Sequence, residues 1–156
     1  MAARDQAARG GHLIITVETS IAAPVELCFD LALDVDVHAE SARFSGEHVV
    51  EPGRTSGVLQ AGDLLTFEGR HFGIRQRFTT RITEVDRPRR FVDEMVRGFF
   101  RKLRHVHEFY SRDHGTLMRD VLEIEGTFAF LLKRHMRWFV ATKQQHLKSI
   151  IEGRYH

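Results

Sequence analysis

The feature that most constrains the fold is a period-two alternation of apolar and polar residues through positions 91–124. The alternation is interrupted at Gly98 and at residues 113–115, and each interruption contains the glycine that tight turns favour. Successive side chains of a strand point to opposite faces, so this pattern is typical of strands with one buried face. The segment therefore predicts three consecutive antiparallel strands joined by two turns.

The two turns also predict how the three strands pair. Centring the first turn near residue 99 places Asp93 opposite His105. Centring the second turn between residues 113 and 114 places Asp120 opposite His107. A slip of one residue in either turn would move these side chains to opposite faces. In this register one face carries a polar row with apolar neighbours: Asp93, His105, His107 and Asp120, bordered by Phe91, Met95, Phe109 and Leu122.

The residues before this segment predict further strands and two short helices. Alternating residues predict strands at 12–20, 48–50, 63–68 and 72–85, with a turn at 69–71. Pro24 suits the first position of a helix, where its missing N–H costs nothing, and Leu27, Cys28 and Leu31 follow at helical spacing. A break near Asp34 predicts a second short helix that ends at about Arg43.

After Gly126 the period changes from two to 3.6, which predicts a helix of about 25 residues capped by Thr127. At about 1.5 Å per residue this helix is nearly 40 Å long, enough to lie across the whole sheet. Its expected apolar stripe is Leu132, Met136, Phe139, Val140, Leu147, Ile150 and Ile151. The basic residues expected mostly on the opposite side are Lys133, Arg134, Arg137, Lys143 and Lys148.

This order of elements predicts an α+β fold with an internal cavity. A strongly curved sheet with one long helix against its concave face rarely fills the space between them. The composition suits an apolar pocket, because the chain has twelve Phe but only two Tyr and one Trp. The long strand predicted at 72–85 would present Gln76 and Phe78 to the same face.

Composition and charge exclude several other classes of protein. The net charge is only +2, and Arg alternates with apolar residues along predicted strands, so we expect no nucleic-acid partner. Cys28 is the only cysteine, which precludes an internal disulfide, and we expect a buried, inert thiol. No signal peptide and no apolar run of membrane-spanning length occur. We therefore expect a cytoplasmic protein with no membrane span.

Local motifs resemble those of one superfamily. Residues 20–29 read SIAAPVELCF, residues 82–88 read ITEVDRP, and residues 105–109 read HVHEF. These segments, with Gly62-Asp63 and Gly115-Thr116, resemble the START-like (Bet v 1-like, SRPBCC) superfamily, which includes polyketide cyclases/dehydrases and lipid-transport proteins. They are most similar to a bacterial branch that also occurs fused to epimerase-like proteins called cell-division inhibitors. Two segments depart from that branch: Gly98-Phe99-Phe100 replaces Gly-Pro-Phe, and Gly126-Thr127 replaces a proline near the last helix.

The resemblance implies a helix-grip fold, in which a curved antiparallel sheet of about six or seven strands wraps around the long C-terminal helix. It implies one ligand-binding domain at 12–153. Residues 1–11 end in Gly10-Gly11, which predicts a disordered tail before this domain. The expected function is binding of a small hydrophobic molecule (lipid, polyketide or isoprenoid-like) in the cavity, as a carrier or sensor. The residues expected to bind it are Phe78, Gln76, Phe91, Asp93, Met95, His105, His107, Phe109, Met118, Asp120, Leu132, Met136 and Phe139.

Several interpretations of the polar row stay open. One interpretation is that its members do no more than hydrogen-bond one another across the strands. Another is that they orient a ligand's hydroxyl or carbonyl. In a cyclase/dehydratase-like enzyme, the acid–base residues would be His105, His107 and Asp120. Two histidines at i and i+2 beside carboxylates also fit a divalent ion, but this spacing is nonspecific.

We therefore predict no metal and no cofactor. A protein-interaction domain and a homodimer remain alternatives. The histidines expected at the surface are His38, His48, His71, His114, His135, His146 and His156.

Overall fold

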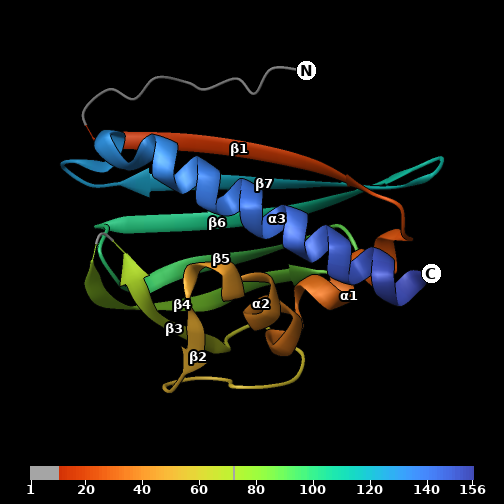
Figure 1. The fold of residues 1–156 in the computed structure, drawn as a ribbon, viewed down its shortest axis with the longest axis horizontal. Coiled ribbons are helices and arrows are strands. Elements are labelled where there is room, and N and C mark those ends of the chain that lie inside the picture. The colour runs from red at the N-terminus through yellow and green to blue at the C-terminus, as the bar shows by residue number, and fades with distance from the viewer. Residues whose placement is uncertain (1–10, 72) are drawn as a thin grey trace.

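The computed structural model describes residues 11–71 and 73–156, and the predicted order of elements is confirmed (Figure 1). Over these residues, seven strands form one antiparallel sheet in the order β1-β7-β6-β5-β4-β3-β2. The strands are β1 (His12–Ile21), β2 (His48–Val50), β3 (Leu64–His71), β4 (Ile74–Asp86), β5 (Arg90–Arg97), β6 (Lys102–Arg112) and β7 (Gly115–Glu125). The helices are α1 (Val25–Ala32), α2 (Val35–Ser41) and α3 (Lys133–Tyr155), with 3₁₀ turns η1 (Arg43–Ser45) and η2 (Ala129–Leu132). The tail predicted at 1–11 lies outside the described residues except for residue 11.

The predicted register of the three central strands is confirmed. Asp93 in β5 lies opposite His105 in β6, and His107 in β6 lies opposite Asp120 in β7. Phe109 lies opposite Met118 in the same ladder. The polar row is therefore continuous across β5, β6 and β7, and it lies in the wall that faces α3.

Helix α3 lies diagonally across the sheet over β1, β7 and β6 (Figure 1). Gln144 fastens the middle of the helix to the sheet. Its amide nitrogen donates to Asp120 Oδ2 at 2.8 Å and to the Val17 carbonyl at 3.1 Å, and its amide oxygen accepts from Thr19 Oγ1 at 2.6 Å. Gln144 is only 2% exposed, so these bonds satisfy an otherwise costly buried amide.

Two apolar clusters pack between the helices and the sheet. One cluster joins α1 to the sheet and to the end of α3, and it includes Phe29, Phe109 and Ile151. The other joins the start of α3 to β1, β6 and β7, and it includes Ile15 and Val140. Cys28 is fully buried in the first cluster, where burial raises the pKa of its thiol, as expected for an inert cysteine.

Two predicted boundaries were wrong. Residues 69–71 do not turn but continue β3, which pairs with β4 as far as His71 and Ile74. Gly69 is needed for close approach instead, since a Cβ there would lie 2.8 Å from Glu47 Cγ. Thr127 does not cap the last helix: η2 intervenes, and α3 has Leu132 at its N-cap without a side-chain bond. None of the helices in the described part of the chain is long and apolar enough to cross a membrane.

Replacing Ile151 by Ala should destabilise the fold, because Ile151 is fully buried where α3 closes the first cluster. We expect the free energy of unfolding to fall by about 2–5 kcal/mol, measured by urea denaturation. Ser149→Ala is the matched control, since Ser149 is exposed on the same helix and should change stability by less than about 0.5 kcal/mol. Equal effects of the two substitutions would contradict this account of how α3 is held.

Candidate functional site

An internal cavity of about 180 Å³ lies between the sheet and helices α2 and α3. Its wall is mainly apolar, and residues of both apolar clusters contribute to it. Eleven of the thirteen residues predicted to bind a ligand line this cavity: Gln76, Phe78, Phe91, Asp93, His105, His107, Met118, Asp120, Leu132, Met136 and Phe139. The structure therefore brings these eleven residues together around one cavity, and their binding of a ligand stays a prediction.

Met95 and Phe109, also predicted to bind a ligand, are not among the residues that line the cavity. Phe109 is buried beneath α1, with its ring centre 5.4 Å from that of Phe29 in an edge-to-face contact. The Met95 sulfur lies at the turn after β5, where it would be 2.7 Å from a Cβ added at Gly98. Phe109 belongs to the first apolar cluster, and Met95 packs against the second.

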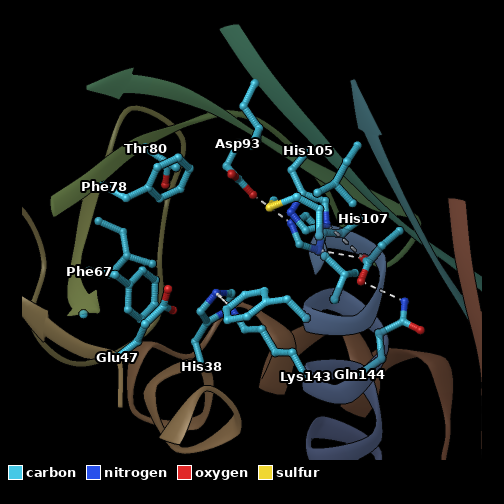
Figure 2. Close-up of a pocket in the computed structure, with 18 of the residues that line it drawn as sticks. His38, Glu47, Phe67, Phe78, Thr80, Asp93, His105, His107, Lys143 and Gln144 are labelled. Atoms are coloured by element: carbon cyan, nitrogen blue, oxygen red, sulfur yellow. Dashed lines mark hydrogen bonds and ion pairs between the residues drawn. The ribbon is translucent and has the colours of Figure 1, made fainter. Parts of the chain in front are cut away.

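The centre of the polar row is His107, which lies between two carboxylates (Figure 2). Its Nε2 is 2.7 Å from Asp93 Oδ2, and its Nδ1 is 3.0 Å from Asp120 Oδ1. The ring also stacks on Phe91 at 4.2 Å and on His105 at 3.8 Å between ring centres. This column of rings fixes the plane of the imidazole so that each nitrogen faces one carboxylate.

The charges of the row follow from this geometry. Burial lowers the pKa of His107, but Asp120 and Asp93 outweigh it and raise the pKa to about 9. Burial raises the pKa of Asp120, and the attraction of His107 and His105 reverses this, so the pKa lies well below its ordinary value. The pKa of Asp93 is also lowered, because the bond from His107 offsets the effect of burial. At neutral pH the row is an imidazolium between two carboxylates.

The pKa of His105 is shifted in the opposite direction from that of His107. Burial and the neighbouring positive charge of His107 lower its pKa, so its imidazole is neutral at neutral pH. Its Nε2 is buried without a hydrogen bond of good geometry among the described residues, and it lies 3.5 Å from Asp120 Oδ1. Its side chain is 17% exposed and lines the cavity. His105 is therefore the member of the row with hydrogen-bonding capacity left for another molecule.

A second polar group lines the cavity and consists of Lys143, His38, His71 and Glu47. The sequence did not predict it. Lys143 from α3 lies with its Nζ 2.6 Å from His38 Nε2 of α2. His71 Nε2 lies 2.7 Å from Glu47 Oε1, and this bond raises the pKa of His71. The expectation that Lys143 faces away from the sheet was wrong.

The expectation that His38, His71 and His135 lie at the surface was also wrong, because all three line the cavity. The other surface assignments hold for the exposed side chains of His48, His114, His146 and His156. One signal in the sequence favoured the correct placement of Lys143. It lies three residues after Val140 and four before Leu147, which is the spacing of the apolar stripe.

Asp93, His105 and His107 also have the arrangement of a metal site, with one donor atom of each within 4.8 Å of the others. The hydrogen bonding of His107 opposes that use. A metal ligand must present an unprotonated nitrogen, whereas both nitrogens of His107 point at carboxylates that favour the protonated ring. Binding of a divalent cation here would therefore have to displace the proton of His107.

Comparison with known proteins shows the family of the chain. The family model described as polyketide cyclase / dehydrase and lipid transport matches residues 21–146. No curated protein matches the chain in sequence.

The solved structures similar to the chain share its fold at low sequence identity. Protein CV1439 of Chromobacterium violaceum has a TM-score of 0.73 at 16% identity, over 89% of this chain and 96% of that one. TTHA0849 of Thermus thermophilus has a TM-score of 0.70 at 19% identity, over 92% and 99%. Major latex-like protein 151 of Panax ginseng has a TM-score of 0.63 at 10% identity, over 90% and 97%.

The two histidines of the row should titrate far apart. In nitrogen–proton correlation spectra at neutral pH, His107 should show two protonated ring nitrogens and His105 one. Asp93→Asn should lower the pKa of His107, since it removes one carboxylate, whereas Glu94→Gln on the opposite face should leave it unchanged. Titration of both rings near the ordinary pKa of 6.5 would refute the charge assignment.

The same shift sets a pH dependence of stability. Because folding raises the pKa of His107 from 6.5 to about 9, its contribution is complete below pH 6.5 and is lost as the pH rises through 9. The loss should be about 3 kcal/mol in the free energy of unfolding. Urea denaturation of wild type and His107→Asn across this interval measures it, because the variant should lack this decline.

Proposed function

Because the chain belongs to the polyketide cyclase / dehydrase and lipid transport family, we propose that it binds a small hydrophobic molecule in its cavity, as a carrier or sensor. The observation that carries the proposal is His105, a neutral imidazole that lines the mainly apolar cavity and whose Nε2 has no hydrogen bond among the described residues. Ligand pockets of this kind combine apolar walls with a few polar groups that fix orientation. His105 is the group suited to hold one hydroxyl or carbonyl oxygen of the ligand.

The size of the cavity narrows the class of ligand. About 180 Å³ is close to the roughly 150 Å³ cavity in which benzene binds to an engineered protein. A compact molecule with one or two rings therefore fits without rearrangement, in keeping with a polyketide- or isoprenoid-derived compound. A long acyl chain would require α3 or the turns around it to move.

Charge also narrows the class of ligand. The row carries two carboxylates and one imidazolium, so it supplies no excess positive charge to attract an anion. An added carboxylate beside Asp93 and Asp120 would experience like-charge repulsion at low dielectric constant. The favoured ligand is therefore neutral, with a polar atom at the end that meets His105.

The hydrogen bond from His105 can be tested with a matched pair of probes, 2-naphthol and naphthalene. Replacing His105 by Phe preserves a flat ring for stacking on His107 but removes the polar nitrogens. We expect the affinity for 2-naphthol, measured by fluorescence titration, to fall by roughly 2- to 13-fold, which corresponds to 0.5–1.5 kcal/mol for one net hydrogen bond. The affinity for naphthalene should not fall.

His114→Phe is the control for this experiment, since His114 is exposed in the turn between β6 and β7. It should bind both probes as the wild type does. An equal loss for both probes in His105→Phe would mean that the substitution damages the cavity and that His105 does not grip the hydroxyl. Failure of the wild type to bind either probe would remove the basis for a ligand-binding function.

A second function, acid–base catalysis, is favoured by one specific observation. The neighbouring histidines have pKa values displaced in opposite directions, which places a neutral base, His105, beside a positively charged ring, His107, that Asp120 orients. In such a pair His105 could remove a proton from the carbon next to a carbonyl, and the positive charge of His107 would stabilise the enolate that forms. This arrangement suits the enolisation steps of a cyclase or dehydratase.

Enolisation is tested by deuterium exchange of 2-indanone in heavy water, followed by proton NMR. An enzyme of this type should accelerate the exchange over buffer, and His105→Phe should abolish the acceleration because it removes the base. The His114→Phe control should exchange the ketone at the wild-type rate. An acceleration that survives in His105→Phe would assign the activity to another group.

A further inference from the structure

We propose that Lys143 makes the cavity a carbonyl-binding site, in which its side-chain amine forms a reversible imine with an apolar aldehyde or ketone. The inference rests on the proposed ligand binding and names a reactive group for the ligand. It concerns the side of the cavity formed by α2, α3 and β3, distinct from the row on β5, β6 and β7.

The amine has one hydrogen-bond partner, a neutral histidine, and one aromatic neighbour. Lys143 Nζ lies 2.6 Å from His38 Nε2 and 5.2 Å from the centre of the Phe67 ring (Figure 2). Among the described residues, no carboxylate lies within the 4.0 Å of an ion pair with this nitrogen. A lysine that faces an internal cavity without a carboxylate partner is an uncommon arrangement, because burial penalises an unpaired ammonium ion.

His38 can act only as an acceptor toward this amine. Its ring hydrogen-bonds the backbone of Ala32, which commits one nitrogen as a donor to a carbonyl. Burial and the neighbouring Lys143 lower the pKa of His38 well below its ordinary value, so Nε2 carries no proton at neutral pH. Nε2 therefore accepts a hydrogen bond from Lys143 and holds the amine at one position in the wall.

The electrostatic environment favours the neutral amine. Burial lowers the pKa of Lys143, and the more distant carboxylates of Glu47, Asp93 and Asp120 offset this only in part. Imine formation requires the neutral amine, which is why lysines in apolar sites are the usual Schiff-base residues. An arginine would remain charged, and the choice of residue is notable because the chain has 19 Arg but only four Lys.

The reaction needs no other reagent. The lone pair of Nζ forms a C–N bond to the carbonyl carbon while the π electrons move to oxygen, and a proton passes from nitrogen to that oxygen. The resulting carbinolamine loses its hydroxyl with a second proton as one water molecule, and the C=N bond forms. His38 Nε2, already hydrogen-bonded to the amine, is placed to relay the proton that nitrogen loses. One amine and one carbonyl give one imine and one water, without oxidation or reduction.

Reductive trapping tests this inference on the full chain. The protein is incubated with benzaldehyde and sodium cyanoborohydride, digested, and mapped by mass spectrometry for benzylated lysines. Since a lowered pKa raises the fraction of neutral amine, we expect Lys143 to be labelled faster than Lys102, Lys133 and Lys148. This mapping uses the wild-type protein and does not depend on the folding of any variant.

Two substitutions sharpen the test. Lys143→Arg keeps a long basic side chain but has no nucleophilic amine, so the fast labelling should disappear while the melting curve remains cooperative. Lys148→Arg is the matched control on the same helix, where Lys148 is bound to the Ser20 carbonyl and Glu152, and it should leave the labelling of Lys143 unchanged. Comparable labelling rates at all four lysines would overturn the inference.

Binding of 2-naphthol by the wild type separates the two proposals. If 2-naphthol binds and Lys143 is not labelled preferentially, ligand binding stands and the imine is refuted. If 2-naphthol does not bind but Lys143 is labelled preferentially, the reactive lysine stands and the hydroxyl-binding function is refuted. Loss of the preferential labelling when excess 2-naphthol fills the cavity would further support a shared site.

Discussion

The structure depends on placing two carboxylates in the wall of an apolar cavity. A buried carboxylate is costly unless it is paired, and one imidazolium, His107, pairs with both Asp93 and Asp120. This arrangement is geometrically demanding, because the three side chains come from three adjacent strands and must share one face. The charges in the cavity wall therefore pair only if β5, β6 and β7 keep this register. The hydrogen bond from Gln144 to Asp120 ties the position of α3 to the same arrangement.

That coupling explains why the polar row could be predicted from the sequence. In a half-buried sheet a slip of one residue would expose every apolar side chain, so the alternating pattern and the two turns leave one consistent register. The turn at Gly98 is itself constrained, since a Cβ there would lie 2.7 Å from both Met95 Sδ and the Phe78 ring. Local information therefore fixed the positions of His105 and His107 relative to the carboxylates. The α+β order of elements and the cavity beneath the last helix followed from the same periodicities.

The second polar group could not be predicted in this way. Each residue turns about 100° around a helix, so a stripe assigned by residue type alone misplaces a basic side chain that lies near its edge. Lys143 was assigned to the outer side because it is charged, although its spacing from Val140 and Leu147 places it at the cavity. Its partner His38 is 105 residues away on a helix of only seven residues, too short for a reliable period. Contacts between distant elements of this kind depend on how α2 and α3 dock, which no local pattern encodes.

Consecutive residues of α3 therefore serve the two sides of the cavity. Gln144 donates a hydrogen bond to Asp120 of the row, and Lys143 presents its amine toward α2. Gln144 and Lys143 project from the same turn of α3, and the hydrogen bonds of Gln144 to Thr19 and Val17 hold that turn against β1. The docking of α3 on the sheet therefore sets the distance between the ionised row and the amine. A ligand that spans this distance experiences a strongly polar wall at one end and a weakly hydrated amine at the other. Such an asymmetric cavity would orient a molecule with one polar end and one carbonyl group, which distinguishes this interior from a uniformly apolar lipid tunnel.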